Sequence, residues 1–136
     1  LYKNHNHQIQ NHMASNKRLL KKEIRTICGA LAGECVIAKL TIPGVNPESF
    51  NQIIYKLADL QESAIRLVSV EFPQSPSSFD NKKAYADARH AYFKEAFTKL
   101  ENNFNKRVEE LVKEMNAALP DEQKIANKEA VAASKK

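Results

Sequence analysis

The chain has 136 residues, of which 27% are charged and 43% hydrophobic, the usual balance of a single globular domain. It contains only three Gly, five Pro and no Trp. So few breakers of regular structure exclude a β-sandwich, a β-barrel or a glycine-rich nucleotide fold, because each of these needs many tight turns. The composition therefore predicts an all-α protein.

The net charge of +5 permits attraction to nucleic acid or to anionic surfaces without demonstrating either. Cys28 and Cys35 are seven residues apart in an expected helix, which separates them by about 10 Å, more than the roughly 7 Å that a disulfide can bridge. Reduced core thiols are expected, and they favour a cytoplasmic location. No segment is as long and apolar as a membrane helix, so no membrane partner is predicted.

Both ends of the chain differ from its middle. Residues 1–12, LYKNHNHQIQNH, place three His among Asn and Gln and resemble a vector-derived affinity tag; the alternative is a natural His-rich metal-binding arm. Residues 120–136 are polar and are predicted to be weakly ordered or a short helix. The folded domain is expected over residues 13–119.

Apolar residues recur every three or four positions in three stretches, which predicts three helices. The helices are expected at about residues 16–40, 47–70 and 81–119. Ser15, Asn46 and Asp80 are the predicted N-caps, and Pro47 suits the first turn of the second helix. The predicted fold is a three-helix antiparallel (up-down-up) bundle with a long third helix.

The third helix would be nearly 60 Å long, against under 40 Å for each of the other two. If these cover its first part, the second half projects and exposes Val108, Leu111, Val112 and Met115. Because a bare apolar stripe is unusual on a stable monomer, these four residues are predicted to anchor a homodimer. The alternative is that the C-terminal tail folds back over them.

The segment from Cys28 to Cys35 places Gly29 and Gly33 on one helix face. Each glycine costs the helix about 1 kcal/mol relative to alanine, so close packing within the chain is the preferred interpretation. The alternative is a groove for a ligand or a partner helix, with a thiol at its edge. A catalytic cysteine is not indicated, because both thiols lie among apolar residues with no cationic neighbour.

Five basic residues cluster at the start of the first helix: Lys17, Arg18, Lys21, Lys22 and Arg25. Cations are unfavourable at a helix N-terminus, and phosphate contacts are one reason to keep them there. A solvated face is the preferred interpretation, because no aromatic residues interleave the basic ones for stacking on bases. A nucleic-acid-associated accessory protein is the alternative function.

A carboxylate–histidine metal site would use Glu34, Asp87 and His90. Di-metal helical bundles need two Glu-x-x-His pairs and two further Glu from four helices, whereas this chain has one Asp-x-x-His pair. A hydrogen-bonded His90 at the core edge is therefore the preferred interpretation. Phosphate-binding loops, zinc spacings and nucleophile elbows are also missing from the sequence, so neither catalytic residues nor a cofactor is predicted.

Residues 13–119, with the segments MASNKRLLKKEIR, IIYKLADLQES and VEELVKEMNAALP, resemble small uncharacterised all-helical bacterial proteins. The resemblance implies a bacterial cytoplasmic setting and supplies neither an activity nor a site residue. The sequence favours a non-enzymatic interaction or structural protein, homodimeric through its third helix and with a further protein partner as an additional option.

Overall fold

The computed structural model describes residues 16–134, except for the side chains of residues 122, 126 and 127. Within that range it contains helices and no strand, which confirms the all-α prediction. The helices are α1 (Lys17–Thr41), α2 (Pro47–Val68), the short 3-10 helix η1 (Pro76–Ser78), α3 (Lys82–Ala117) and α4 (Asp121–Ser134). The predicted tag-like leader, residues 1–12, lies outside the described residues.

Asparagine side chains cap the three long helices. Asn46 caps α2 as predicted, accepting a hydrogen bond from the backbone N–H of Glu48. The cap of α1 is Asn16, whereas the predicted cap, Ser15, lies outside the described residues. The predicted cap of the third helix was wrong: α3 begins at Lys82, and Asn81 takes the capping role instead of Asp80.

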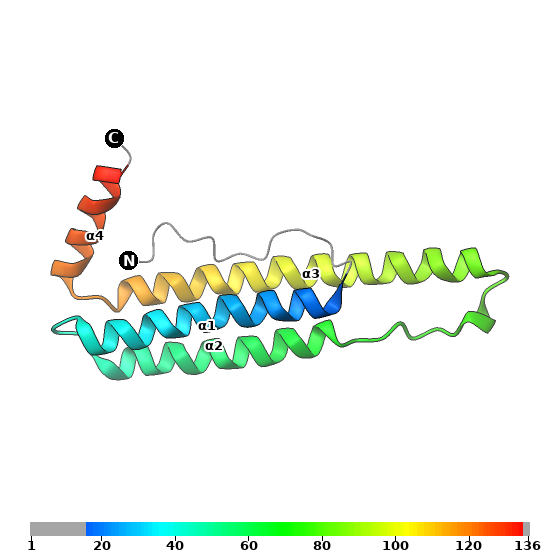
Figure 1. The fold of residues 1–136 in the computed structure, drawn as a ribbon, viewed down its shortest axis with the longest axis horizontal. Helices are drawn as coiled ribbons and strands as arrows, with labels where there is room; N and C mark the ends of the chain where they lie inside the picture. Colours follow the sequence, from blue (N-terminus) through cyan, green and yellow to red (C-terminus); the bar gives the residue numbers. More distant parts are fainter. Residues whose placement is uncertain (1–15, 135–136) are drawn as a thin grey trace.

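The three long helices lie side by side, with α1 and α2 joined by a short turn and α3 running along both (Figure 1). Gly44 in that turn has a φ of 81°, a left-handed conformation that glycine adopts without strain. Buried side chains from all three helices form one core; its largest members include Phe50, Phe104, Ile24, Leu31, Leu57, Leu111 and Met115.

The part of α3 that projects beyond its neighbours is its N-terminal part, not its C-terminal part (Figure 1). Val108, Leu111 and Met115 are at most 1% exposed, and Val112 is half-buried. The predicted exposure of this stripe was wrong, because the prediction placed the start of α3 beside the end of α2. The linking residues 69–81 instead run past the ends of α1 and α2 before α3 begins (Figure 1).

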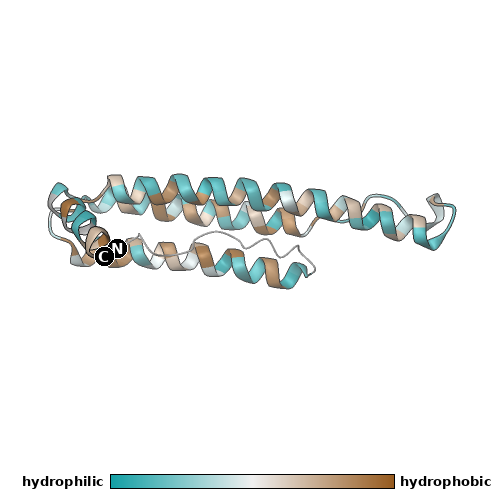
Figure 2. Ribbon diagram, turned by 90° about the horizontal axis from the view of Figure 1, so that it is seen from above, coloured by the Kyte–Doolittle hydropathy of each residue, from teal (hydrophilic) through white to brown (hydrophobic). Residues whose placement is uncertain are grey.

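The linking residues pack against the projecting part of α3 through an aromatic cluster, which consists of Phe72, Phe79, Tyr85, Tyr92 and Phe93. The ring centroid of Phe72 lies 5.6 Å from that of Tyr85 and 5.4 Å from that of Tyr92. This contact leaves the rings of the cluster half-buried on a helix segment that is otherwise largely hydrophilic (Figure 2). A loop and not a second helix therefore partly covers the apolar side chains of this segment.

Candidate functional site

The side of α1 that faces away from the core is uncharged between residues 26 and 40. The buried side chains of the helix, such as Ile24, Leu31 and Cys35, lie on its opposite side. The exposed residues recur every three or four positions and therefore share one face, about 21 Å long. We call this the outer face of α1; it consists of Thr26, Gly29, Ala30, Gly33, Val36, Ile37 and Leu40.

The C-terminal half of the outer face is apolar and open to solvent. Val36 is 40% exposed, Ile37 55% and Leu40 75%. A single exposed apolar side chain is ordinary on a protein surface. Three such side chains within about one and a half turns of helix, next to two glycines, instead form a continuous surface that another apolar surface can cover.

Among residues 16–134, nothing packs against the glycines of the outer face. A Cβ atom added to Gly29 or Gly33 would meet no atom of a neighbouring element within 4 Å. The preferred interpretation of these glycines as intrachain packing residues was therefore wrong. Their lack of side chains leaves a shallow place where a second helix can approach the α1 backbone closely.

The two thiols lie on the core side of α1, so neither is at the edge of the outer face. Cys28 is 2% and Cys35 0% exposed, and both are free. Burial raises the pKa of the Cys28 thiol to about 11; burial and the nearby Glu34 carboxylate raise that of Cys35 to about 12. Both remain protonated at neutral pH, which makes them poor nucleophiles.

The structure divides the five basic residues of α1. The Nζ atom of Lys17 donates to the Val70 carbonyl oxygen at 2.7 Å and lies 4.7 Å from the ring centroid of Phe93. Lys21 is half-buried. Arg18, Lys22 and Arg25 are exposed, and their spacing places them on the same side of α1 as the outer face. We call these three residues the basic stripe.

The three residues of the alternative metal site do not come together. Asp87 and His90 lie on the projecting part of α3, where Asp87 pairs with Lys83 at 2.8 Å and His90 is exposed. Glu34 lies about 25 Å along α1 from Lys17, and Lys17 is the residue of α1 that contacts Phe93 of α3. Glu34 is therefore far from Asp87 and His90, which precede Phe93. Within the described residues, no group of three His, Cys, Asp or Glu side chains could hold a metal ion.

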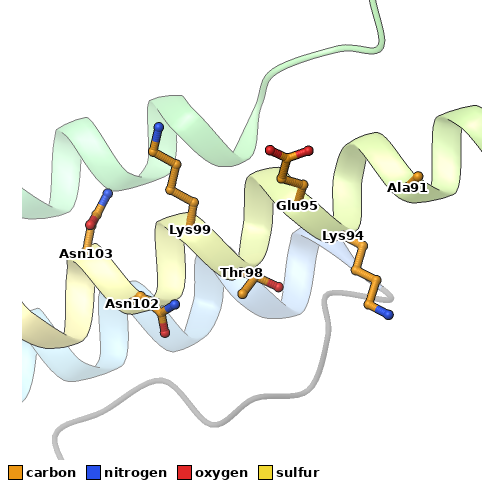
Figure 3. Close-up of a pocket in the computed structure, with 7 residues that line it drawn as sticks. All are labelled: Ala91, Lys94, Glu95, Thr98, Lys99, Asn102 and Asn103. Atoms are coloured by element: carbon orange, nitrogen blue, oxygen red, sulfur yellow. The ribbon is translucent and has the colours of Figure 1, made fainter.

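A shallow hollow on α3 offers no catalytic arrangement. It is lined by Ala91, Lys94, Glu95, Thr98, Lys99, Asn102 and Asn103 (Figure 3). All of these belong to one helix, and their side chains point in different directions instead of converging (Figure 3). The described lining residues therefore pair no nucleophile with a general base.

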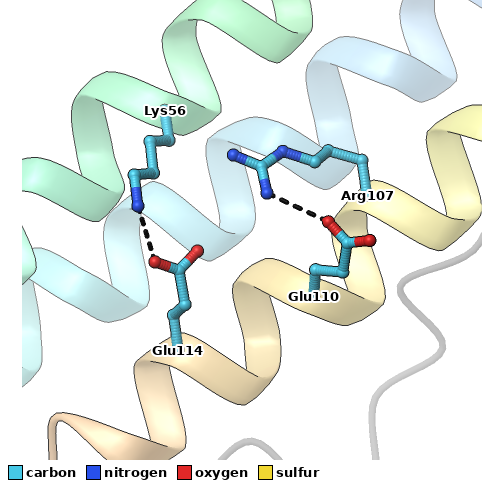
Figure 4. Close-up of polar contacts among 4 residues, drawn as sticks. All are labelled: Lys56, Arg107, Glu110 and Glu114. Atoms are coloured by element: carbon cyan, nitrogen blue, oxygen red, sulfur yellow. Dashed lines mark hydrogen bonds and ion pairs between the residues drawn. The ribbon is translucent and has the colours of Figure 1, made fainter.

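One ion pair connects α2 to α3, and another lies within α3. Lys56 of α2 and Glu114 of α3 meet at 2.6 Å, and Arg107 and Glu110 pair within α3 at 3.1 Å (Figure 4). These groups are partly exposed and already paired. Their role is structural, which leaves the outer face of α1 as the candidate site.

No family model matches the chain, and neither a curated protein nor a solved structure matches it. In the part of the chain that the structure describes, every helix is too short or too polar to cross a membrane.

Proposed function

We propose that the protein is a non-enzymatic interaction protein whose outer face of α1 docks a helix of another polypeptide. In this proposal α1, α2 and α3 act as an up-down-up bundle in the cytoplasm, and the bundle holds α1 rigid for its partner. The observation that carries the proposal is the position of Gly29 and Gly33, which open to solvent in the middle of a helix beside exposed apolar residues.

Gly29 and Gly33 carry an energetic cost in the isolated helix. Each weakens the isolated helix by about 1 kcal/mol relative to alanine, and in the described part of the chain no contact at the Cβ position of either residue offsets that cost. A docked helix offsets this cost. The two backbones then approach closely at the glycines, and burial of Val36, Ile37 and Leu40 stabilises the complex by about 25 cal/mol per Å² of apolar surface. The proposal thus explains both the glycines and the exposed apolar residues.

The proposal is tested by replacing the glycines with alanine. The Gly29→Ala/Gly33→Ala variant should have a free energy of unfolding about 1–2 kcal/mol higher than the wild-type chain. The reason is that alanine is the better helix former and its methyl group meets open space. Urea titrations of dilute protein measure the difference. The matched control is Ala30→Gly on the same face, which should lower the free energy of unfolding by about 1 kcal/mol. Destabilisation by the double variant would show that the glycines serve the fold, and the proposal would fall.

The alternative function, nucleic-acid binding, has less support from the structure than from the sequence, because fewer of the five basic residues are free to contact phosphates. Lys17 is engaged with Val70 and Phe93, and Lys21 is half-buried. The three residues of the basic stripe remain, and they continue directly into the uncharged outer face. A mixed basic and apolar face of this kind fits a protein helix better than a phosphate backbone.

A further inference from the structure

We propose that the partner of the outer face is a second copy of this chain, bound antiparallel so that Gly29 of one protomer lies against the partner's Gly33. The inference rests on the proposed function and names the partner of the same face. It follows from three properties of α1: the spacing of its glycines, the distribution of its charges and the chemistry at its C-terminal end.

The spacing of the outer face makes it complementary to itself. A two-fold axis at the level of Leu31, midway between the glycines, brings Gly29 to the level of the partner's Gly33 and repeats that contact by symmetry. The same axis brings Lys22 to the level of the partner's Leu40. The shallow place left by the glycines thus coincides with the crossing point of the two helices, where their backbones must approach most closely.

The charge distribution selects this face and the antiparallel direction. The chain carries a net charge of +5, so two copies repel each other over much of their surface, whereas the outer face is uncharged. A parallel pair would place one basic stripe directly against the other. In the antiparallel pair the two copies of Arg25 are roughly 18 Å apart and those of Lys22 roughly 27 Å, both well beyond the screening length of about 8 Å.

The antiparallel pair also gives the basic stripe acidic neighbours. Glu48 is exposed in the first turn of α2, directly after the turn that follows α1. Asp121 is 97% exposed and follows Pro120. The Cγ atom of Pro120 lies 3.7 Å from the point where a Cβ atom on Gly44 would stand, so Asp121 lies near that same turn. The C-terminal end of α1 is the negative end of the helix dipole, and there Glu48 and Asp121 are balanced by Lys39 and by Lys124, which pairs with Asp121 at 3.8 Å. The basic stripe of one protomer faces this end of the partner.

The test uses cross-linking between copies of the full chain that each carry one added thiol. Lys22→Cys and Leu40→Cys chains are mixed and treated briefly with a short bismaleimide. A covalent dimer is expected in the mixture and in neither variant alone, because like positions lie roughly 27 Å apart in the antiparallel pair. The wild-type chain is the control for Cys28 and Cys35, which are buried and protonated at neutral pH.

Each other outcome overturns this inference. A covalent dimer of Leu40→Cys alone would mean a parallel pair. No covalent dimer, with a monomer mass at every concentration, would exclude a second copy; a stability gain in Gly29→Ala/Gly33→Ala would then leave the proposed function standing with a helix of a different protein. A chain that dimerises only after removal of residues 120–136 would mean that α4 covers the outer face.

Discussion

The Nζ atom of Lys17, at the start of α1, lies 4.7 Å from the ring centroid of Phe93, the twelfth residue of α3. This contact places the beginning of α1 about one third of the way along α3. The residues of α3 that precede Phe93 therefore extend beyond α1, and those that follow it contribute to the core. The contact between Lys17 and Phe93 therefore shows that the first third of α3 lies outside the three-helix core.

Loss of the Lys17 side chain should destabilise the fold. Lys17→Met removes a hydrogen bond to the Val70 carbonyl oxygen and a cation–π contact, together worth about 1–2 kcal/mol. Urea unfolding measures the change. Arg18→Met is the matched control, because the Arg18 side chain is exposed, and it should change stability by under about 0.5 kcal/mol. Equal effects of the two substitutions would show that Lys17 does not fasten α1 to the linking residues.

Truncation of the buried stripe of α3 should cost far more than truncation of an exposed leucine. Leu111 is 0% exposed, so Leu111→Ala should lower the free energy of unfolding by about 3–5 kcal/mol. Leu67 is 54% exposed, and Leu67→Ala should cost under about 1 kcal/mol. Thermal and urea unfolding measure both. A small effect of Leu111→Ala would mean that this half of α3 is a surface after all.

The sequence predicted the helices well because their signals are local. Asn46 followed by Pro47 is a helix start that needs no tertiary information, and the apolar spacing of α1 marks which side is buried. The relative positions of the helices could not be obtained in this way. The apolar stripe around Leu111 looks the same whether the core or a second protomer covers it, and only the path of residues 69–81 distinguishes the two.

High pH should destabilise the protein through its core thiols. The unfolded thiols ionise near pH 9.0, whereas the folded ones hold their protons to about pH 11 and 12. The stability that the protonated thiols contribute is complete below pH 9.0 and is lost as the pH rises towards these folded pKa values. Each thiol adds a slope of up to about 1.4 kcal/mol per pH unit.

Urea unfolding between pH 8 and 10.5 measures this dependence. The Cys28→Ala/Cys35→Ala variant is the reference, since it lacks both thiols and keeps every other side chain. Its stability should fall less steeply above pH 9 than that of the wild-type chain. Parallel slopes would show that the thiols are accessible to water in the folded protein.

The ion pair between α2 and α3 should be weak and sensitive to salt. Lys56 and Glu114 meet at 2.6 Å with side chains 43% and 39% exposed, so a double-mutant cycle should give a coupling energy of about 0.5–1 kcal/mol at low salt. The coupling should fall at 1 M salt, where the screening length is about 3 Å. The Arg66–Glu62 pair within α2 is the control, at about 0.3 kcal/mol. A coupling of zero at low salt would contradict the pairing.

The candidate site could be found in the sequence only in part. Gly29 and Gly33 are conspicuous inside a helix, but a glycine pair does not reveal which side of the helix the core occupies. The apolar spacing of α1 leaves Val36, Ile37 and Leu40 off the buried side, but it does not show that they form a continuous exposed surface beside the glycines. The alternative metal site is not formed, because residues on separate helices meet only if the helix ends align, and Glu34 and His90 lie at distant levels. The preferred interpretation of His90 as a core-edge residue was wrong, since His90 is exposed.

Light scattering of the full chain over a range of concentrations shows whether the outer face of α1 joins two copies. We expect a mass approaching twice the 15.4 kDa of the monomer at high concentration and falling on dilution, because the outer face is short for a protein interface. The Ile37→Glu/Leu40→Glu variant should remain folded and monomeric throughout. A wild-type monomer at every concentration, or a dimer that survives these two glutamates, would rule out a dimer through this face.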